Sequence, residues 1–133
     1  MANMTIGAVL GETTSGKKSR LRKVTFTHTS VGTAAGAATT TFLITGRLLR
    51  FITTGGDAAW TFVLNDGTAN IYTSASLDTT ATSGALNTHA TVPHSGIPMV
   101  GQYLTCTTAG VSNVGGGTAP TITIIWEESD TIR

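Results

Sequence analysis

The residues best suited to bind a metal ion are the two histidines of the segment HATVPH, His89 and His94, which lie five positions apart. A zinc site needs a third and usually a fourth ligand from His, Cys, Asp or Glu. His28 is the other imidazole of the chain, and no Cys, Asp or Glu stands near the pair at a spacing that zinc sites use. We therefore expect a histidine-containing loop or interface here, with no metal site and no bound cofactor.

Paired carboxylates can carry out acid–base hydrolysis, but the acidic residues of this chain are poorly arranged for it. Adjacent residues on a strand point to opposite faces, so Glu127 and Glu128 cannot share a site. Asp57 and Asp66 stand in turn sequences, where such side chains accept backbone hydrogen bonds. No serine has the G-x-S-x-G pattern of a nucleophile elbow, and SNVGGGT lacks the Lys-Ser/Thr ending of a phosphate-binding loop. The sequence predicts that the protein is not an enzyme.

The single cysteine, Cys106, cannot form a disulfide within the chain, which fits synthesis in a reducing cytosol. It stands in QYLTCTT, a segment that alternates as a strand does. Free cysteine is among the most buried residue types. We expect Cys106 to be a small core residue and not a reactive thiol.

Five of the eight positive charges fall within the seven residues KKSRLRK: Lys17, Lys18, Arg20, Arg22 and Lys23. Such a run can bind nucleic acid, anionic lipid or an acidic protein surface, or can simply be solvated. No aromatic residue that could stack on bases stands near it, and the formal net charge is only +1. We therefore expect a partner-binding segment without specific affinity for nucleic acid.

The elements that must position these residues are β-strands. Only 11% of the residues are charged, against about 25% in an average soluble domain, and about a fifth are threonine. Threonine suits a half-exposed pleated surface, and glycine suits turns. No apolar run reaches the length of about 18 residues that a membrane span needs, so no membrane association is expected.

Alternation of apolar and polar residues predicts strands over 23–30, 41–53, 58–65, 68–76, 102–108 and 121–129. A bulge or a close backbone approach is expected at Gly46, a hairpin turn at Gly55-Gly56 and a second turn at Asp66-Gly67. Segment 77–101 is predicted to be a long loop with one short strand near 88–92. The predicted core consists of Phe26, Phe42, Ile44, Trp60, Phe62, Leu64, Ile122, Ile124 and Trp126.

Seven or eight short antiparallel strands without a helical pattern indicate an all-β fold, either a β-sandwich or a jelly roll, with an eight-stranded barrel as the competing arrangement. The length of 133 residues allows a single domain. We assign that domain to residues 21–133 and predict a flexible N-terminal arm over residues 1–20.

The strand predicted over 41–53 is apolar on both faces, which leaves hydrophobic area for a partner copy. The sequence therefore predicts a homo-oligomer, either a dimer or a trimer. Its interface is expected to use Leu43, Leu49 and Phe51.

With its threonine- and glycine-rich strands, its polar arm, the hairpins of TFLITGRLLRFITTGGDAAWTFVLNDGTA and the closing strand TITIIWEES, the chain resembles the small virion proteins of tailed bacteriophages, especially jelly-roll capsid decoration or cement proteins. This resemblance implies a protein that is made in the host cytoplasm, binds the major capsid protein on the capsid surface and stabilises the shell without catalysis. The alternative is a carbohydrate- or receptor-binding β-sandwich module of a phage tail fibre. In that alternative, sugar rings would stack on Trp60, Tyr72, Tyr103 or Trp126.

Overall fold

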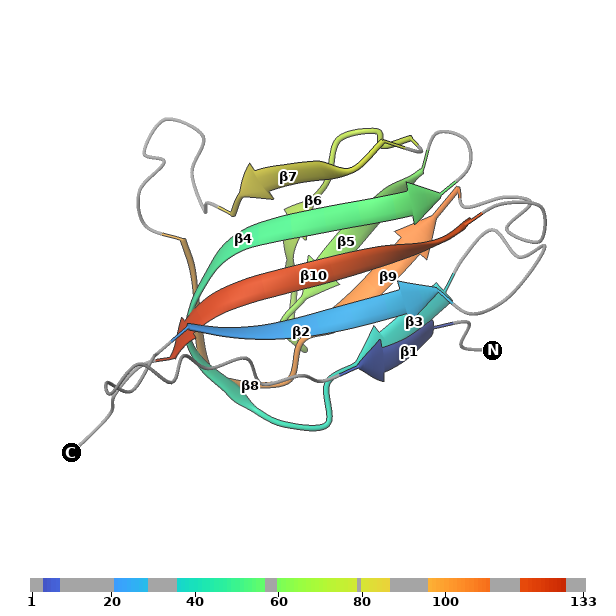
Figure 1. Cartoon of the computed structure of the whole chain (residues 1–133). Coiled ribbons are helices and arrows are strands. Elements are labelled where there is room, and N and C mark those ends of the chain that lie inside the picture. Colours follow the sequence, from blue (N-terminus) through green and yellow to red (C-terminus); the bar gives the residue numbers. More distant parts are fainter. Residues whose placement is uncertain are drawn as a thin grey trace.

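The computed structural model describes residues 4–7, 21–28, 36–56, 60–78, 80–86, 96–110 and 118–128. These residues form ten β-strands in two antiparallel sheets, without a helix (Figure 1). Sheet A contains β1 (Met4–Gly7), β2 (Leu21–His28), β4 (Ile44–Gly56), β7 (Thr82–Ala85), β8 (Ile97–Gln102) and β10 (Thr118–Glu128). Sheet B contains β3 (Gly36–Thr39), β5 (Thr61–Asn65), β6 (Asn70–Thr73) and β9 (Thr105–Ala109). Within this part of the chain, no helix is long and apolar enough to cross a membrane.

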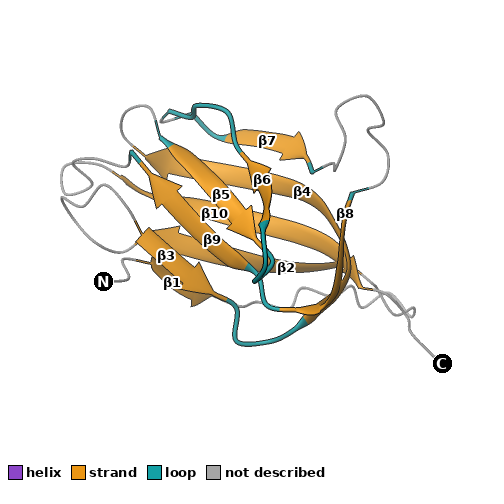
Figure 2. Ribbon diagram, turned by 180° about the vertical axis from the view of Figure 1, so that it is seen from behind, coloured by secondary structure: helices purple, strands orange, loops and turns teal. Residues whose placement is uncertain are grey.

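The two sheets form a β-sandwich with the strand order of a jelly roll. Sheet A runs β1-β2-β10-β4-β7, with β8 also paired to β4, and sheet B runs β3-β9-β5-β6. Figure 2 shows sheet B from its outer side, in front of sheet A. Without β1 and β8, eight strands remain in two four-stranded sheets, as expected of a jelly roll. The predicted fold class is confirmed, and the sheets do not close into a barrel.

The core lies between the sheets and comes from alternate residues of the strands. On β2, Val24, Phe26 and His28 are fully buried, while the threonines between them are half-exposed. The predicted core residues that are buried are Phe26, Ile44, Trp60, Phe62, Leu64, Ile122, Ile124 and Trp126. Phe42 is only partly buried and stacks on Trp126, with 5.8 Å between the ring centroids.

Strand β4 contains one more residue than the segment of β10 that it pairs with. Trp126 of β10 pairs with Leu48, but the preceding residue of β10, Ile125, pairs with Arg50. Leu49 is therefore the extra residue of a β-bulge. Before the bulge the even-numbered residues of β4 point into the core, and after it the odd-numbered residues do so.

This bulge corrects the predicted oligomer interface. Simple alternation puts Leu43, Leu49 and Phe51 on one outward face, but Phe51 is buried in the core, 5% exposed. Its ring lies edge-on to that of Phe62, with 5.2 Å between the centroids. Leu43 is exposed and Leu49 is half-exposed. Phe51 cannot belong to an interface, because the extra residue turned the strand over between Leu48 and Phe51.

The bulge predicted at Gly46 belongs to the partner strand, because one residue of β4, Thr45, stands opposite two residues of β8, Val100 and Gly101. The pairing of β4 with β8 shifts register between Ile44, which pairs with Gln102, and Gly46, which pairs with Met99. Gly46 has a φ of 145°, a backbone conformation that favours glycine.

The turn at Asp66-Gly67 is confirmed, since it joins β5 and β6 as an antiparallel pair. The hairpin predicted at Gly55-Gly56 is wrong, because β4 and β5 belong to different sheets. The two glycines instead mark the point where the chain leaves sheet A for sheet B. Gly55 has a φ of 77°, a conformation that hairpin turns also use.

Segment 77–101 is not the long loop that its small residues suggest. It contains β7 and most of β8, which lie one after the other along the same edge of β4. The strand predicted near 88–92 lies outside the described residues. Part of the predicted arm also joins the fold, because β1 pairs antiparallel with β2, from Met4 opposite His28 to Gly7 opposite Thr25. An arm over residues 1–20 otherwise stays a prediction.

Candidate interaction surface

The outer face of sheet A is covered by threonines at the end where β2 finishes. Thr25 and Thr123 face each other across β2 and β10, and their Oγ1 atoms lie 3.0 Å apart in a hydrogen bond. Thr54 and Thr121 form a matching hydroxyl pair across β4 and β10. These pairs satisfy hydroxyls within the sheet.

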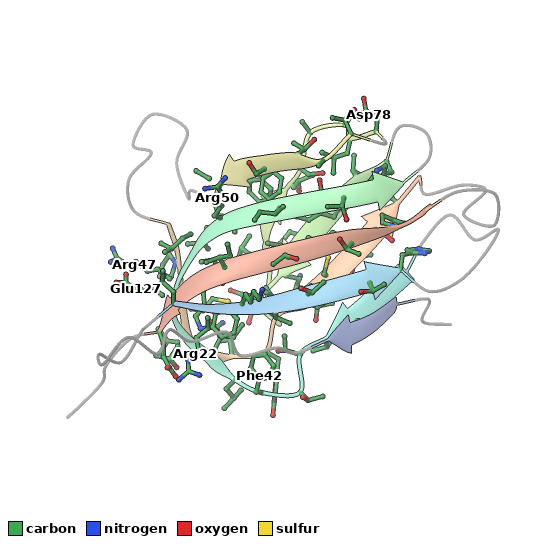
Figure 3. The ribbon with its side chains drawn as sticks, in the orientation of Figure 1. Arg22, Phe42, Arg47, Arg50, Asp78 and Glu127 are labelled. Atoms are coloured by element: carbon green, nitrogen blue, oxygen red, sulfur yellow. The ribbon has the colours of Figure 1, made fainter. Side chains whose placement is uncertain are left out.

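The opposite end of the same face carries charge. The Arg47 Nη2 atom lies 3.0 Å from Glu127 Oε1, and the two side chains are 53% and 41% exposed. At the same end of sheet A, between β2 and β10, Arg22 Nη2 lies 2.9 Å from Glu128 Oε1. Figure 3 shows Arg22, Arg47 and Glu127 together at this end of the sheet. Both ion pairs join neighbouring strands, so they fix the ends of β2, β10 and β4 against one another.

Two further cations lie on this face in one row across three strands. Lys23 pairs in register with Ile125, and Ile125 pairs with Arg50. Lys23 and Arg50 are exposed, and Ile125 between them is half-buried. The Arg50 guanidinium donates a hydrogen bond to Ser83 Oγ at 3.1 Å. Within the described residues, neither cation has an ion pair with a carboxylate. We call Lys23, Ile125 and Arg50 the cationic row.

The large apolar side chains that remain exposed gather at the same end of sheet A. Among the described residues these are Val100 at 77%, Leu43 at 55%, Tyr103 at 49% and Leu21 at 48% exposure. Three of them surround the pairing of β4 with β8. Leu43 precedes Ile44 and Tyr103 follows Gln102, and these two neighbours pair with each other.

Alternation places the three side chains outside the sandwich. Each of them adjoins a buried residue, because Ile44, Met99 and Leu104 point into the core. Leu43, Val100 and Tyr103 therefore project away from the core around the β4–β8 pairing. We call these three residues the apolar corner.

Sheet B presents a different outer face. Its four strands, as described, contain no charged residue. Thr39 and Thr105 hydrogen bond through hydroxyl oxygens 2.7 Å apart. The Asn65 side-chain amide donates to Asn70 Oδ1 at 2.9 Å. The face is polar but uncharged, and cross-strand pairs satisfy much of its hydrogen bonding.

At one end of sheet B, Asp66 organises the β5–β6 turn. Its carboxylate accepts hydrogen bonds from the backbone N–H groups of Thr68 at 2.8 Å and Ala69 at 2.9 Å. These bonds favour the charged form, so the Ala69 and Thr68 amides hold the pKa of Asp66 below its usual value. This is a structural role, as predicted for a turn aspartate.

The structure separates the predicted basic cluster. Lys17, Lys18 and Arg20 lie outside the described residues. Arg22 is committed to Glu128, and Lys23 is exposed on the outer face of sheet A. Of the predicted partner-binding run, Lys23 is thus the described residue that the surface presents to a partner.

The predicted loop histidines, His89 and His94, also lie outside the described residues. His28 is fully buried at the end of β2. The described residues contain no group of three His, Cys, Asp or Glu that could hold a metal ion. Cys106 is fully buried as predicted, and burial raises the pKa of its thiol far above the ordinary value.

The aromatic side chains offer little platform for sugar rings. Trp60 and Trp126 are 1% and 3% exposed, so stacking of a sugar on either tryptophan is excluded. Tyr72 is partly buried against Phe51 and Phe62, and burial raises its pKa. Tyr103 is the candidate that remains exposed.

Val100 was missed as a surface residue because segment 77–101 was predicted to be a loop. A signal was present, since Ile97 and Met99 alternate with Pro98 and Val100 as a strand requires. Pro98 and Gly101 obscured it, because both residues usually mark turns.

No protein-family model matches the chain, and no curated protein matches it. A solved structure of a carbohydrate-binding module, CBM36, in complex with calcium and xylotriose is similar to it at 16% sequence identity and a TM-score of 0.40. The similarity covers 96% of this chain and 94% of that chain. A TM-score this low transfers neither a ligand nor a function, so the surfaces above are interpreted from their own residues.

Proposed function

We propose that this chain is a non-enzymatic structural protein that binds and stabilises a bacteriophage capsid shell, as a decoration or cement protein. Its partner is the major capsid protein of the same virion, and its place is the capsid surface after synthesis in the host cytoplasm. The resemblance of the sequence to small virion proteins supports this proposal. A chain with few charges and with hydroxyls paired across its strands is suited to packing against protein surfaces.

The observation that carries the proposal is the apolar corner. A residue such as Val100 at 77% exposure has a hydration cost that a protein partner removes. Tyrosine is enriched in the energetically important centres of interfaces, and Tyr103 lies in this corner. Each contact of so small a patch is weak. On a shell with many equivalent sites, weak contacts of an oligomer add through effective concentration.

The same corner is the proposed site of self-association into a dimer or trimer. Leu43, the exposed residue of the predicted oligomer interface, supports this, whereas the buried Phe51 does not. An oligomer formed through part of the corner would present several capsid-binding surfaces on one particle.

Jelly rolls occur both in viral capsid proteins and in lectins, so the fold by itself is an analogy compatible with two functions. The second candidate is a carbohydrate- or receptor-binding module of a phage tail fibre. The exposed ring of Tyr103 favours it, since an aromatic side chain of this kind can stack on a sugar. Burial of both tryptophans counts against a wider platform.

Co-sedimentation of the chain with shells of the major capsid protein tests the proposal. The double variant Leu43→Asp/Val100→Asp should lose most of its binding, because two charges would be placed in the apolar corner. A matched control, Thr73→Asp/Thr107→Asp, adds the same charge to exposed positions of sheet B and should bind as the wild type does. Analytical ultracentrifugation of both variants reports self-association separately.

If the wild-type chain does not sediment with shells, the capsid proposal is wrong. In that case, glycan binding that Tyr103→Ala abolishes would establish the second candidate. Equal loss of shell binding in both double variants would show that net charge, and not the apolar corner, governs attachment.

A further inference from the structure

We infer that the cationic row on the outer face of sheet A is a docking site for an acidic protein surface. The inference rests on the proposed function, which supplies a protein partner, and adds that the part of the partner facing sheet A is acidic. It concerns Lys23, Ile125 and Arg50, which are distinct from the apolar corner.

The geometry of the row suits a pair of carboxylates. Lys23 and Arg50 flank β10 in the same register, so their backbones lie two strand spacings apart, roughly 10 Å. Both side chains are exposed and long enough to reach past the surface of the sheet. Ile125 lies between them and offers an apolar contact to a partner that covers the row. A central apolar residue with charges at the rim is the usual arrangement of an interface.

The charges around the row leave it with a positive excess. On the outer face of sheet A, the described charged residues are Lys23, Arg47, Arg50 and Glu127, and Arg47 already pairs with Glu127. Lys23 and Arg50 thus remain for an external anion. In the sequence, four cations stand just ahead of Lys23: Lys17, Lys18 and Arg20, and Arg22, which pairs with Glu128.

An acidic protein surface fits this row better than two other partners. A second copy related by a two-fold axis would bring Lys23 and Arg50 against the same cations of its partner, which is unfavourable. Single-stranded nucleic acid needs aromatic stacking, and the three residues of the row include no aromatic side chain. Carboxylates on a partner protein satisfy both charges and allow Ile125 to be covered.

Sheet B provides a row of matched geometry without the charges. Thr107 pairs with Val63, and Val63 pairs with Thr73, so two exposed residues again flank a half-buried aliphatic residue across three strands. The double variant Thr73→Glu/Thr107→Glu changes the net charge by the same amount as Lys23→Gln/Arg50→Gln. It does so on the opposite face, and it serves as the control.

The test measures binding of fluorescent poly-L-glutamate to the full chain by anisotropy, at low and at high salt. We expect Lys23→Gln/Arg50→Gln to weaken binding about tenfold at low salt, since two surface charge pairs are lost. The sheet B control should weaken it by less than about twofold, because its added charges lie on the far face. Circular dichroism establishes that both variants are folded.

Equal weakening by the two double variants would overturn the inference, because binding would then follow net charge alone. Duplex DNA bound as tightly as poly-L-glutamate, with the same loss in the row variant, would assign the row to nucleic acid instead. Self-association that disappears in the row variant would assign it to a second copy. Shell binding in the co-sedimentation assay tests the proposed function separately. A chain that binds poly-L-glutamate through the row but ignores shells would keep this inference and refute the capsid role.

Discussion

Two rows of side chains, one on each outer face of the sandwich, have the same geometry and different chemistry. In sheet A, Lys23 and Arg50 flank Ile125, and in sheet B, Thr107 and Thr73 flank Val63. Both central residues are half-buried aliphatic side chains. The fold thus fixes a half-buried aliphatic residue at the centre of each row, and it accepts either charged or uncharged side chains at the two exposed flanking positions. Because neither Lys23 nor Arg50 has an ion pair with a carboxylate within the described residues, we attribute these two charges to what that face contacts.

The largest expected effects concern what the two faces share, which is a single core. Trp126→Ala in sheet A and Phe62→Ala in sheet B should each lower the free energy of unfolding by about 3 to 5 kcal/mol. Both side chains are nearly or fully buried between the sheets, so similar losses are expected. Urea unfolding followed by circular dichroism and by tryptophan fluorescence should give coincident transitions for the wild type. Two separate transitions would mean that the sheets are independent, and the comparison of their faces would lose its basis.

A medium effect should distinguish a glycine of sheet A from one of sheet B. Gly96, just ahead of β8, has a φ of 71°, and an added Cβ would lie 2.6 Å from the Leu48 carbonyl oxygen. Gly67, in the β5–β6 turn, has a φ of 96° but no atom within 4 Å of such a Cβ. We expect Gly96→Ala to cost about 3 kcal/mol, from backbone strain plus the clash, and Gly67→Ala about 1 kcal/mol from strain alone.

Thermal or urea unfolding of the two alanine variants measures this difference. The Gly67→Ala variant is the control for the positive φ, because it lacks the clash. Equal losses in the two variants would show that β8 shifts easily away from β4. The edge of sheet A beside the apolar corner would then be no more rigid than an exposed turn.

The smallest effect is the pH dependence contributed by Asp66 at the end of sheet B. Its folded pKa is lowered by the Ala69 and Thr68 amides, so the charged carboxylate stabilises the fold at neutral pH. This contribution is complete above the unfolded value of about 3.9. It is lost as the pH falls through the lower folded pKa. Asp66→Asn should therefore show a smaller drop in melting temperature between neutral pH and pH values below about 3 than the wild type does.

The melting temperature at neutral pH should be lower in this variant, because an amide accepts the two backbone hydrogen bonds less strongly than a carboxylate. A pH profile identical to that of the wild type would mean that the turn makes no ionic contribution.

The sequence allowed the faces of individual strands to be predicted, because alternation has a period of two residues and is visible locally. The burial of Val24 and Phe26 on β2 and of Ile122 and Ile124 on β10 follows from that pattern. The cationic row does not. Lys23 and Arg50 come together only because β10, from the far end of the chain, lies between β2 and β4. Such pairings depend on tertiary packing, which no local pattern reports.

For the same reason, only part of the apolar corner could be predicted from the sequence. Leu43 was predicted to be an exposed interface residue, and the structure exposes it. Val100 and Tyr103 join it through the pairing of β4 with β8, across more than fifty residues of sequence. The orientation of Phe51 was predicted wrongly because a bulge inserts one extra residue and does not change the composition of the strand. Alternation with a period of two predicts the inward and outward residues correctly on each side of the bulge, but the two sides are out of phase with each other.

The bulge at Leu49 also affects how sequences related to this one must be aligned. On its two sides, β4 pairs with different edge strands, β8 along Ile44–Leu48 and β7 along Arg50–Thr53. A homologue that lacks the extra residue would have to exchange the inward and outward sets of one half, and with them the character of the edge strand beside it. A gap at Leu49 in an alignment therefore indicates that the relative has different outward-facing residues in one half of β4. A substitution score that treats β4 as one uniform strand would miss it.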